Sequence, residues 1–226
     1  DRSLNFNLAG YYYKYKDLQV GATERREDGI VATRTLNAAS AKVYGLEMEA
    51  SYSPPGADGL TLAVSANWNH ARYGTFRNAP CGGSQTVAQG CNQIFDANKL
   101  DSTTGLKGLF TAQDLSGGKL VRAPDFSGSI SADYELPLPG DKKLLLGSNV
   151  YYSSSYSTQL SNRPGFTQKA FAKLNANVAL IGPEDAWEVA LIGNNLANKI
   201  TASNCFLSNL RNSLFGGQVA GGPNPG

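Results

Sequence analysis

The sequence lacks most of the residues from which active sites are built. It has one histidine, His70, among 226 residues, so the chain by itself cannot supply a histidine-based metal cluster, and nothing around His70 suggests a Ser-His-Asp triad. No phosphate-binding loop is present, and Ser116–Lys119 fits the Ser-x-x-Lys pattern only formally, inside a Gly-rich turn. We therefore expect no enzyme activity, no metal and no cofactor, and we interpret His70 as an interfacial residue.

Charge and long apolar runs are also scarce. Only 17% of the residues are charged, against about 25% in soluble domains, and the net charge of +2 with no basic block argues against nucleic acid as a partner. No run of about 18 apolar residues exists, which excludes a transmembrane helix. A membrane β-barrel remains possible because its apolar band occupies only every second residue. No signal peptide is visible at Asp1 and the chain begins within an expected strand, so we expect a fragment or an excised region of a longer protein.

Cysteine is rare, with three residues in the chain. Cys81 and Cys91 are separated by nine residues in a stretch rich in Gly, Ser and Gln. No histidine lies nearby, so the spacing favours a local disulfide over a metal pair or free thiols, and it implies an oxidising compartment. Cys205 has no evident partner and is either free or paired outside this chain.

What the sequence does contain is a repeated alternation of apolar and small polar residues. Residues 60–68, LTLAVSANW, place Leu60, Leu62, Val64, Ala66 and Trp68 on one face of an expected strand. Similar segments predict seven strands in the chain. Their expected ranges are 4–16, 42–52, 60–73, 125–136, 144–156, 167–181 and 187–195.

The connections between these strands alternate between short and long. The short ones contain Pro and Gly and cover residues 53–59, 137–143 and 182–186, whereas the long ones cover residues 17–41, 74–124 and 157–166. In an up-and-down antiparallel sheet, all short turns then lie at one end and all long loops at the other. This asymmetry is typical of bacterial outer-membrane barrels, with short periplasmic turns and long extracellular loops.

The two faces of the predicted strands support a membrane wall. Even-numbered residues are apolar in the second to sixth strands and odd-numbered residues in the seventh. Aromatic residues lie near both ends of the apolar band: Tyr52, Tyr134 and Trp187 at the short-turn end, and Tyr44, Trp68 and Tyr152 at the long-loop end. The eight residues from Tyr44 to Tyr52 span about 20 Å along the axis of a barrel whose strands tilt by about 40°, close to the ~25 Å apolar band of such a barrel. A soluble β-sandwich is the alternative, but a loop of about 50 residues is unusual in a compact soluble domain.

Several short motifs resemble the TonB-dependent outer-membrane receptor family. They are Asn37-Ala38 with Tyr44-Gly45-Leu46-Glu47-Met48-Glu49, Arg122-Ala123-Pro124-Asp125-Phe126-Ser127, Asp133-Tyr134-Glu135-Leu136-Pro137-Leu138, Tyr151-Tyr152, and Asn194-Asn195-Leu196-Ala197-Asn198-Lys199. Ala197 departs from the family pattern. Each motif alone is weak, but their order and spacing cover nearly all of the chain.

The resemblance implies that residues 1–226 form the carboxyl-terminal part of a 22-stranded barrel, with the plug domain and last strand absent from this chain. Such receptors lie in the outer membrane of Gram-negative bacteria, surrounded by lipid, and import scarce nutrients, most often ferric siderophores, with energy delivered through TonB. The fragment alone is not expected to be a working transporter, because an open sheet edge in lipid leaves backbone groups unpaired. A passive porin and an extracellular β-sandwich adhesin are the alternative functions.

Ligand contacts are expected at the long-loop end of the lumen. The odd-numbered residues there are Tyr73, Ser153, Ser155, Lys169 and Phe171. The aromatic rings could stack on an aromatic chelator, and the lysine could attract an anionic ferric complex. The alternative for each residue is that it only lines the lumen. The wall carboxylates, Glu47, Glu49, Asp133 and Glu135, are interpreted as structural, facing the plug rather than forming an acid–base pair.

Overall fold

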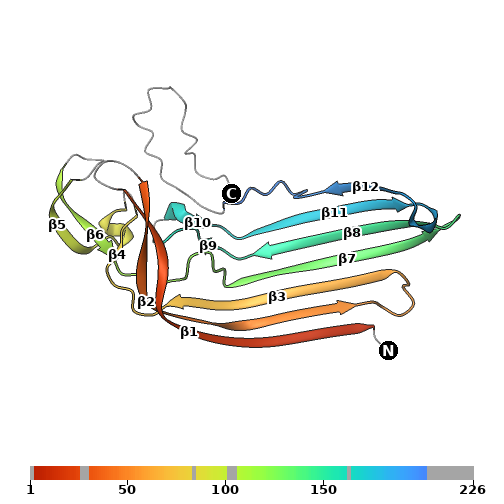
Figure 1. Cartoon of the computed structure of the whole chain (residues 1–226), viewed down its shortest axis with the longest axis horizontal. Helices are drawn as coiled ribbons and strands as arrows, with labels where there is room; N and C mark the ends of the chain where they lie inside the picture. The colour runs from red at the N-terminus through yellow and green to blue at the C-terminus, as the bar shows by residue number, and fades with distance from the viewer. Residues whose placement is uncertain (1–2, 26–30, 83–84, 101–105, 162–163, 203–226) are drawn as a thin grey trace, which may run out of the picture.

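Seven long antiparallel strands form one sheet in the computed structural model, which describes residues 3–25, 31–82, 85–100, 106–161 and 164–202. The sheet order is β1-β2-β3-β7-β8-β11-β12, so each long strand lies beside its neighbours along the chain (Figure 1). The bounds are β1 (Leu4–Arg25), β2 (Val31–Tyr52), β3 (Leu60–Tyr73), β7 (Phe126–Leu138), β8 (Lys142–Ser153), β11 (Phe171–Ile181) and β12 (Glu188–Gly193). We call this sheet the wall. No helix in the described residues is long and apolar enough to cross a membrane.

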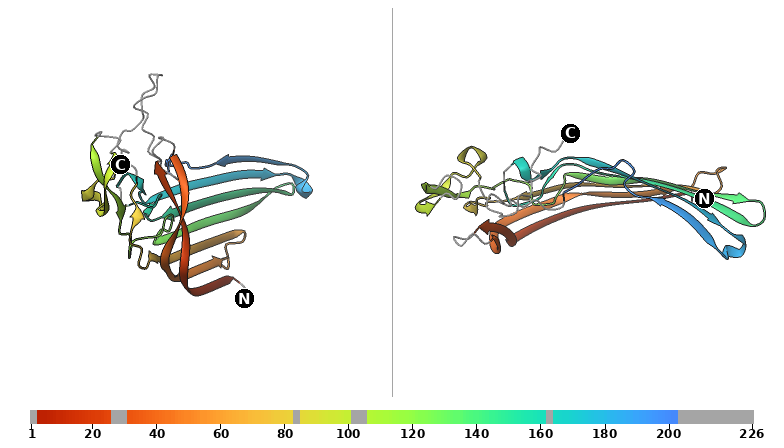
Figure 2. Two further views of the ribbon diagram at one scale, coloured as in Figure 1. Left: turned by 60° about the vertical axis from the view of Figure 1, so that its left-hand side comes forward. Right: turned by 90° about the horizontal axis from the view of Figure 1, so that it is seen from above.

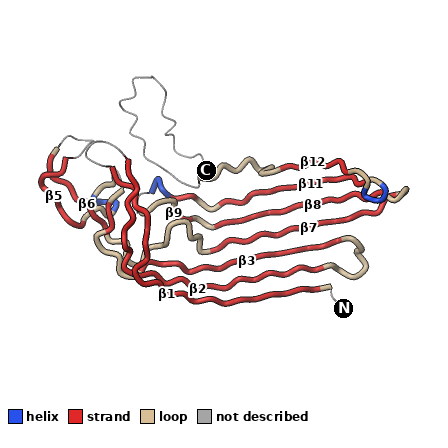
Figure 3. Tube along the Cα trace, viewed as in Figure 1, coloured by secondary structure: helices blue, strands red, loops and turns tan. Residues whose placement is uncertain are grey.

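Short turns join the strands at one end of the wall, as the sequence predicts (Figure 3). They connect β2 to β3, β7 to β8, and β11 to β12, the last through the short 3₁₀ helix η3 (Pro183–Asp185). The first turn depends on Gly59, which has φ +83°, a conformation that favours glycine. A Cβ atom at Gly59 would lie 2.1 Å from the backbone oxygen of Glu135, so the close approach of β7 also excludes a side chain.

The strand register confirms the predicted faces. Val64 of β3 lies opposite Ile130 of β7, which lies opposite Val150 of β8, which lies opposite Leu174 of β11. Directly opposed residues share a face of the sheet, so these side chains form an apolar row across four strands. The predicted change of parity in the last strand is confirmed as well, because Leu191 lies opposite Val178. Figure 2 shows the wall as a single curved layer, and no second sheet covers either face among the described residues.

The prediction of a loop at residues 17–41 is wrong. β1 and β2 continue through it as a hairpin, and their pairing keeps one register from Leu4 opposite Tyr52 to Arg25 opposite Val31. Asp17, the first residue of the expected loop, lies inside the strand with φ 54°. The hairpin is continuous because strand pairing keeps the same register on both sides of Asp17. The outer half of the hairpin turns out of the plane of the wall (Figure 1).

The long connections fold into small sheets of their own. Residues 74–124 contain a three-stranded sheet of order β4-β6-β5 and the 3₁₀ helix η1, and residues 154–170 contain the pair β10-β9 and the helix η2. Their bounds are β4 (Ala79–Pro80), η1 (Val87–Gln89), β5 (Gln93–Leu100), β6 (Lys107–Gln113), β9 (Tyr156–Ser157), η2 (Pro164–Phe166) and β10 (Thr167–Gln168). The sixth predicted strand therefore begins at Phe171 rather than at residue 167, because residues 167–168 pair with β9.

A buried apolar cluster joins these connections to the outer half of the β1–β2 hairpin. We call the described residues of 74–124 and 154–170, together with that half-hairpin, the cap. The buried members are Ala22, Tyr73, Phe76, Ala79, Leu115 and Leu160, with Leu18, Val20, Leu36, Leu120 and Val121 packed against them. Residues from three separate segments thus share one small core at the long-loop end of the wall.

Candidate functional site: the polar face and the cap

The disulfide predicted in the largest connection is present. Cys81 and Cys91 are bonded, with their Cα atoms 5.6 Å apart, and the bridge ties the end of β4 to the segment after η1. Cys91 is almost completely buried. The question of a partner for Cys205 lies outside the described residues.

Buried glutamines hold two connections of the cap together. Gln113 has no exposed surface, and its Nε2 donates to the backbone oxygen of Pro80 at 2.8 Å. Its Oε1 accepts from Nε2 of Gln85 at 2.8 Å, and Oγ of Ser161 donates to Oε1 of Gln85 at 3.0 Å. Because Ser161 belongs to the second long connection, this chain of hydrogen bonds fixes the two connections relative to each other.

Tyr73, one of the predicted ligand residues, lies inside the cap. Its side chain is 4% exposed, and its ring centroid is 5.1 Å from that of Phe76. Burial raises the pKa of the Tyr73 phenol, and a hydrogen bond with the Val121 backbone opposes this only in part. Tyr73 also lines a pocket of about 210 Å³ between the two long connections, together with Lys119 and Ser157.

The other four predicted residues lie near the start of β11. Phe171 and Ser153 are directly opposed across β8 and β11, and both are buried. The ring of Phe171 contacts that of Tyr151 at 6.0 Å between centroids. Lys169 is exposed and Ser155 is half-buried. The structure therefore brings Ser153 and Phe171 together, but it does not gather all five residues in the pocket that Tyr73 lines.

A ladder of three tyrosines on the polar face of β1 was missed by sequence reasoning. The ring centroids of Tyr11 and Tyr13 are 5.7 Å apart, and those of Tyr13 and Tyr15 are 6.2 Å apart. Tyr13 and Tyr15 are 53% and 42% exposed. The hydroxyl of Tyr11 donates to Oδ1 of Asn69 at 3.1 Å, which fixes the inner end of the ladder. Tyrosines at alternate positions of a predicted strand were a readable signal for such a surface.

Small polar side chains make up most of the rest of the polar face of the wall. Nδ2 of Asn67 donates to Glu47 at 3.0 Å, and the hydroxyls of Ser65 and Ser129 are 2.8 Å apart. A hollow of about 380 Å³ lies on this face, lined in part by Asn5, Asn7, Glu49, Ser51, Ser65, Ser129 and Ser131. No group of three metal-ligating side chains occurs among the described residues. The face offers hydrogen bonds to a partner or solute.

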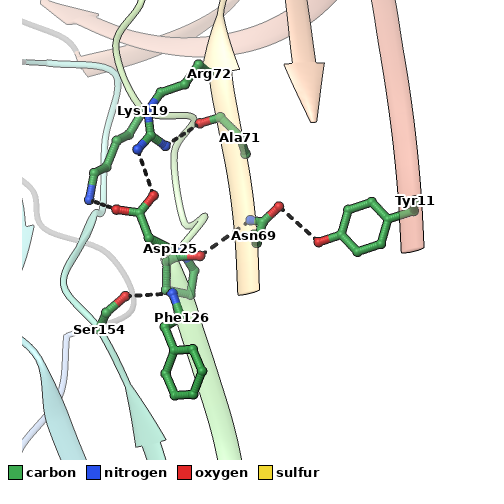
Figure 4. A network of polar contacts seen from close by, with 9 residues as sticks. Tyr11, Asn69, Ala71, Arg72, Lys119, Asp125, Phe126 and Ser154 are labelled. Atoms are coloured by element: carbon green, nitrogen blue, oxygen red, sulfur yellow. Dashed lines mark hydrogen bonds and ion pairs between the residues drawn. The ribbon is translucent and has the colours of Figure 1, made fainter. Parts of the chain in front are cut away.

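An ion-pair network anchors the Arg-Ala-Pro motif at the start of β7 (Figure 4). Nη2 of Arg72 donates to Oδ1 of Asp125 at 2.8 Å, Nζ of Lys119 donates to Oδ2 of Asp125, and the Phe126 N–H donates to Oγ of Ser154 at 3.0 Å. Burial raises the pKa of the Asp125 carboxyl, but the hydrogen bonds from Lys119 and Arg72 outweigh this and hold the pKa below its usual range. The network joins β3, the end of the largest connection and the start of β7.

Comparison with solved structures finds the same fold in two iron receptors. The ferric yersiniabactin uptake receptor FyuA from Yersinia pestis is 13% identical, with a TM-score of 0.60, over 92% of this chain and 24% of FyuA. The FrpB iron transporter from Neisseria meningitidis, in its F3-3 variant, is 18% identical, with a TM-score of 0.50, over 88% of this chain and 25% of FrpB. The chain thus spans about a quarter of each protein. Comparison with curated protein sequences finds no match.

The family comparison covers most of the chain. Residues 1–196 match the family described as "TonB dependent receptor-like, beta-barrel". This range contains the wall, the cap and all the motifs quoted above except the last residues of Asn194–Lys199. With its antiparallel strands, short turns at one end and long connections at the other, the chain belongs to the TonB-dependent receptor family, as part of its β-barrel.

Proposed function

We propose that this chain is the carboxyl-terminal part of the barrel of an outer-membrane receptor that actively imports a scarce nutrient, a ferric siderophore being the leading candidate. In this proposal residues 1–226 supply barrel wall and extracellular connections, TonB acts through a plug domain encoded elsewhere in the protein, and the chain catalyses no reaction. The observation that carries the proposal is the family match over residues 1–196. The similarity to two proteins named as iron receptors supports the choice of substrate.

The two faces of the wall support a barrel with lipid on its outside and a plug domain or hydrated path on its inside. The apolar face exposes large side chains such as Phe6 at 55%, Ile130 at 66% and Leu191 at 77%, which suits lipid. The opposite face carries the Ser and Asn side chains around the 380 Å³ hollow and suits a plug domain or a hydrated path. The ligand would enter from the cap end, where the tyrosine ladder offers exposed aromatic rings and Lys169 offers a positive charge. Tyr73 would contribute through the pocket that it lines, and the buried Phe171 would support Ser153 from behind.

Uptake by the full-length receptor tests the proposal. Cells that lack their other iron receptors would be given radioactive ferric siderophores of catecholate, hydroxamate and phenolate type, with TonB present or deleted. We expect energy-dependent uptake of at least one chelate, lost on deletion of TonB. Uptake that persists without TonB would establish a passive porin, and receptor released from cells without detergent would establish an extracellular adhesin.

A matched pair of variants tests whether the polar face contacts the ligand. Tyr13→Ala removes an exposed ring from the tyrosine ladder, whereas Tyr12→Ala removes a similarly exposed ring from the apolar face of the same strand. An aromatic contact contributes about 0.5–1.5 kcal/mol, so Tyr13→Ala should raise the KM for uptake about 2- to 13-fold. Tyr12→Ala should leave KM unchanged, and equal effects of both variants would contradict a ligand path along this face.

A further inference from the structure

The inner end of the tyrosine ladder is held differently from the other two rings. Tyr11 is half-buried, whereas Tyr13 and Tyr15 are exposed. The hydroxyl of Tyr11 donates to Oδ1 of Asn69 at 3.1 Å (Figure 4), with a longer contact of 3.5 Å to Oδ1 of Asn67. Tyr11 belongs to β1 and both asparagines belong to β3, and these strands are about 10 Å apart with β2 between them. The phenol therefore reaches its partners by lying across β2.

Gly45 of β2 provides the space for this ring. It lies directly opposite Tyr11 on one side and Asn69 on the other, so the three residues share the polar face. A Cβ atom at Gly45 would lie 2.5 Å from the hydroxyl oxygen of Tyr11 and 2.8 Å from the ring carbon that carries it. Any side chain at this position would therefore lift the phenol off the wall and away from Asn69.

The two exposed rings have no such space. Tyr13 lies opposite Val43 and Tyr15 lies opposite Ala41, so a Cβ atom stands at the place that is empty at Gly45. The tyrosine ladder thus contains one ring that is fixed across the wall and two rings that remain exposed, with 5.7 Å and 6.2 Å between neighbouring centroids.

A second hydrogen bond orients Asn69. Its Nδ2 donates to the backbone oxygen of Pro124 at 3.4 Å, so that its Oδ1 is left to accept from the Tyr11 hydroxyl. Pro124 directly precedes Asp125, whose ion pairs hold the start of β7. The ring of Tyr11 is thus fixed twice, by the space at Gly45 and by an amide that the Arg-Ala-Pro motif holds in place.

We propose that Gly45 and Asn69 are positioning residues, which hold Tyr11 across the wall as a fixed aromatic contact for the transported ligand. The inference rests on the proposed function, because it takes the polar face to be the ligand path. Stacking a ligand on a fixed ring costs little side-chain entropy, whereas stacking on the exposed rings of Tyr13 and Tyr15 requires these rings to be ordered. Gly45 and Asn69 act through Tyr11 and contact no ligand themselves.

Nitration of the purified full-length receptor tests the position of the ring without any ligand. Tetranitromethane modifies accessible phenols, so Tyr11 should react more slowly than Tyr13, with both rates measured by mass spectrometry of peptides. Gly45→Ala should raise the Tyr11 rate to that of Tyr13. Asn69→Ala adds no atom to the wall and should raise the Tyr11 rate in part, which keeps the test decisive if Gly45→Ala does not fold.

Gly128→Ala is the matched control. A Cβ atom at Gly128 would lie 2.5 Å from the backbone oxygen of Ser65, much as one at Gly45 would lie 2.1 Å from that of Trp68. Gly128 lies on the apolar face, so its substitution disturbs the backbone of the wall without touching Tyr11. It should leave the nitration of Tyr11 unchanged.

Affinity for a ferric chelate tests whether the fixed ring contacts the ligand. The probes are radioactive ferric siderophores of catecholate, hydroxamate and phenolate type, and the Kd is measured on purified receptor. Gly45→Ala should raise the Kd about 2- to 13-fold, the range expected for one aromatic contact. Asn69→Ala should raise the Kd in the otherwise unchanged receptor and have no effect beside Tyr11→Phe, because Asn69 acts through the Tyr11 hydroxyl.

Three outcomes would overturn the positioning of Tyr11: unchanged nitration in both variants, equal acceleration by Gly128→Ala, or an effect of Asn69→Ala on the Kd that is as large beside Tyr11→Phe as without it. Uptake that persists without TonB would refute the transport proposal, and the nitration result would stand. TonB-dependent uptake with a Kd that Gly45→Ala leaves unchanged would refute the ligand contact and leave the transport proposal intact.

Discussion

The wall and the cap treat apolar side chains in opposite ways. In the wall, large residues such as Ile130 and Leu191 are 66% and 77% exposed on one face of a single sheet. In the cap, Phe76 and Leu115 are 4% and 5% exposed within a small core made from three segments. An exposed apolar face is stable only where the surroundings are apolar, whereas a buried core forms in water. This difference fits the proposed function, in which the wall lies in lipid and the cap lies in water.

The two regions also differ in what holds them together. The wall depends on ladders between neighbouring strands, whereas the cap has short strands and uses side chains to satisfy its buried backbone groups. Oγ1 of Thr158 donates to the Phe166 oxygen at 2.8 Å, and Gln113 contacts the Pro80 oxygen in a similar way. The disulfide adds a covalent constraint in the same region. Side-chain hydrogen bonds to the backbone thus stabilise the irregular segments of the cap, whereas backbone ladders hold most of the wall together.

The largest expected effect comes from placing a charge on the apolar face. Ile130→Arg in the full-length receptor should lower the free energy of unfolding from a bilayer by about 2–4 kcal/mol, because the proposed function places this exposed side chain in lipid at the middle of the strand. Ser131→Arg places the same charge on the polar face, one residue further along the strand, and should lower the free energy of unfolding much less. Equal effects in denaturant titrations from lipid vesicles would show that the two faces do not differ in environment.

Removing the disulfide should affect the cap alone. Cys81→Ser/Cys91→Ser opens a loop with a sequence separation of 10 and should destabilise the cap by about 2–3 kcal/mol by the chain-entropy argument. Hydrogen exchange should become faster in β4, β5 and β6 and stay unchanged in β7 and β8. Faster exchange throughout the wall would mean that the two regions unfold together rather than independently.

Truncating the buried glutamine should have a slightly smaller effect. Gln113→Ala removes the side-chain donor to the Pro80 oxygen and one of the two acceptors of Gln85 Nε2, which keeps its bond to the Gln89 oxygen, and it should destabilise the cap by about 1–3 kcal/mol. Gln19→Ala, at an exposed position of the hairpin, is the matched control and should change little. Proteolysis rates at the cap would measure both variants. If Gln113→Ala left the proteolysis rate unchanged, the buried hydrogen-bond network would not be a stabilising element of the cap.

The smallest effect is expected at the boundary between the regions. The pKa of Asp125 is lowered, so its ion pairs stabilise the fold above the carboxyl's usual pKa near 4 and are lost as the pH falls through the lowered value. Because the carboxyl is about one-third exposed, the contribution should be below about 1 kcal/mol. Asp125→Asn should remove this acid-dependent step from the stability profile of the cap. A step of unchanged size in the variant would assign it to another carboxyl.

The sequence predicted the wall well and the cap poorly. Alternation in residues 60–68, the parity change before Leu191 and the Pro- and Gly-rich turns all concern neighbours along one strand, and the register confirms them. The disulfide could be predicted because Cys81 and Cys91 are close in sequence. The continued hairpin through Asp17 could not be predicted, because a residue with low strand propensity is held there by the pairing of its neighbours, Lys16 and Leu18, with the opposite strand.

The candidate site also has some features that the sequence could predict and others that it could not. Phe171 and Ser153 could be placed together from their strands, and the tyrosine ladder was readable from Tyr11-Tyr12-Tyr13-Lys14-Tyr15. The burial of Tyr73 and the contact between Gln85 and Ser161, which are 76 residues apart, could not be predicted. No local pattern encodes which loops meet.

The sequence by itself determined the two faces of the wall and the position of its turns, because a period of two along a strand is a local property. It also determined the disulfide, because the two cysteines are close in sequence. The tertiary structure alone decided the core of the cap, the bend of the hairpin and the hydrogen bond that joins Gln85 to Ser161. These depend on the register between strands and on contacts between distant segments, which only the folded chain brings together.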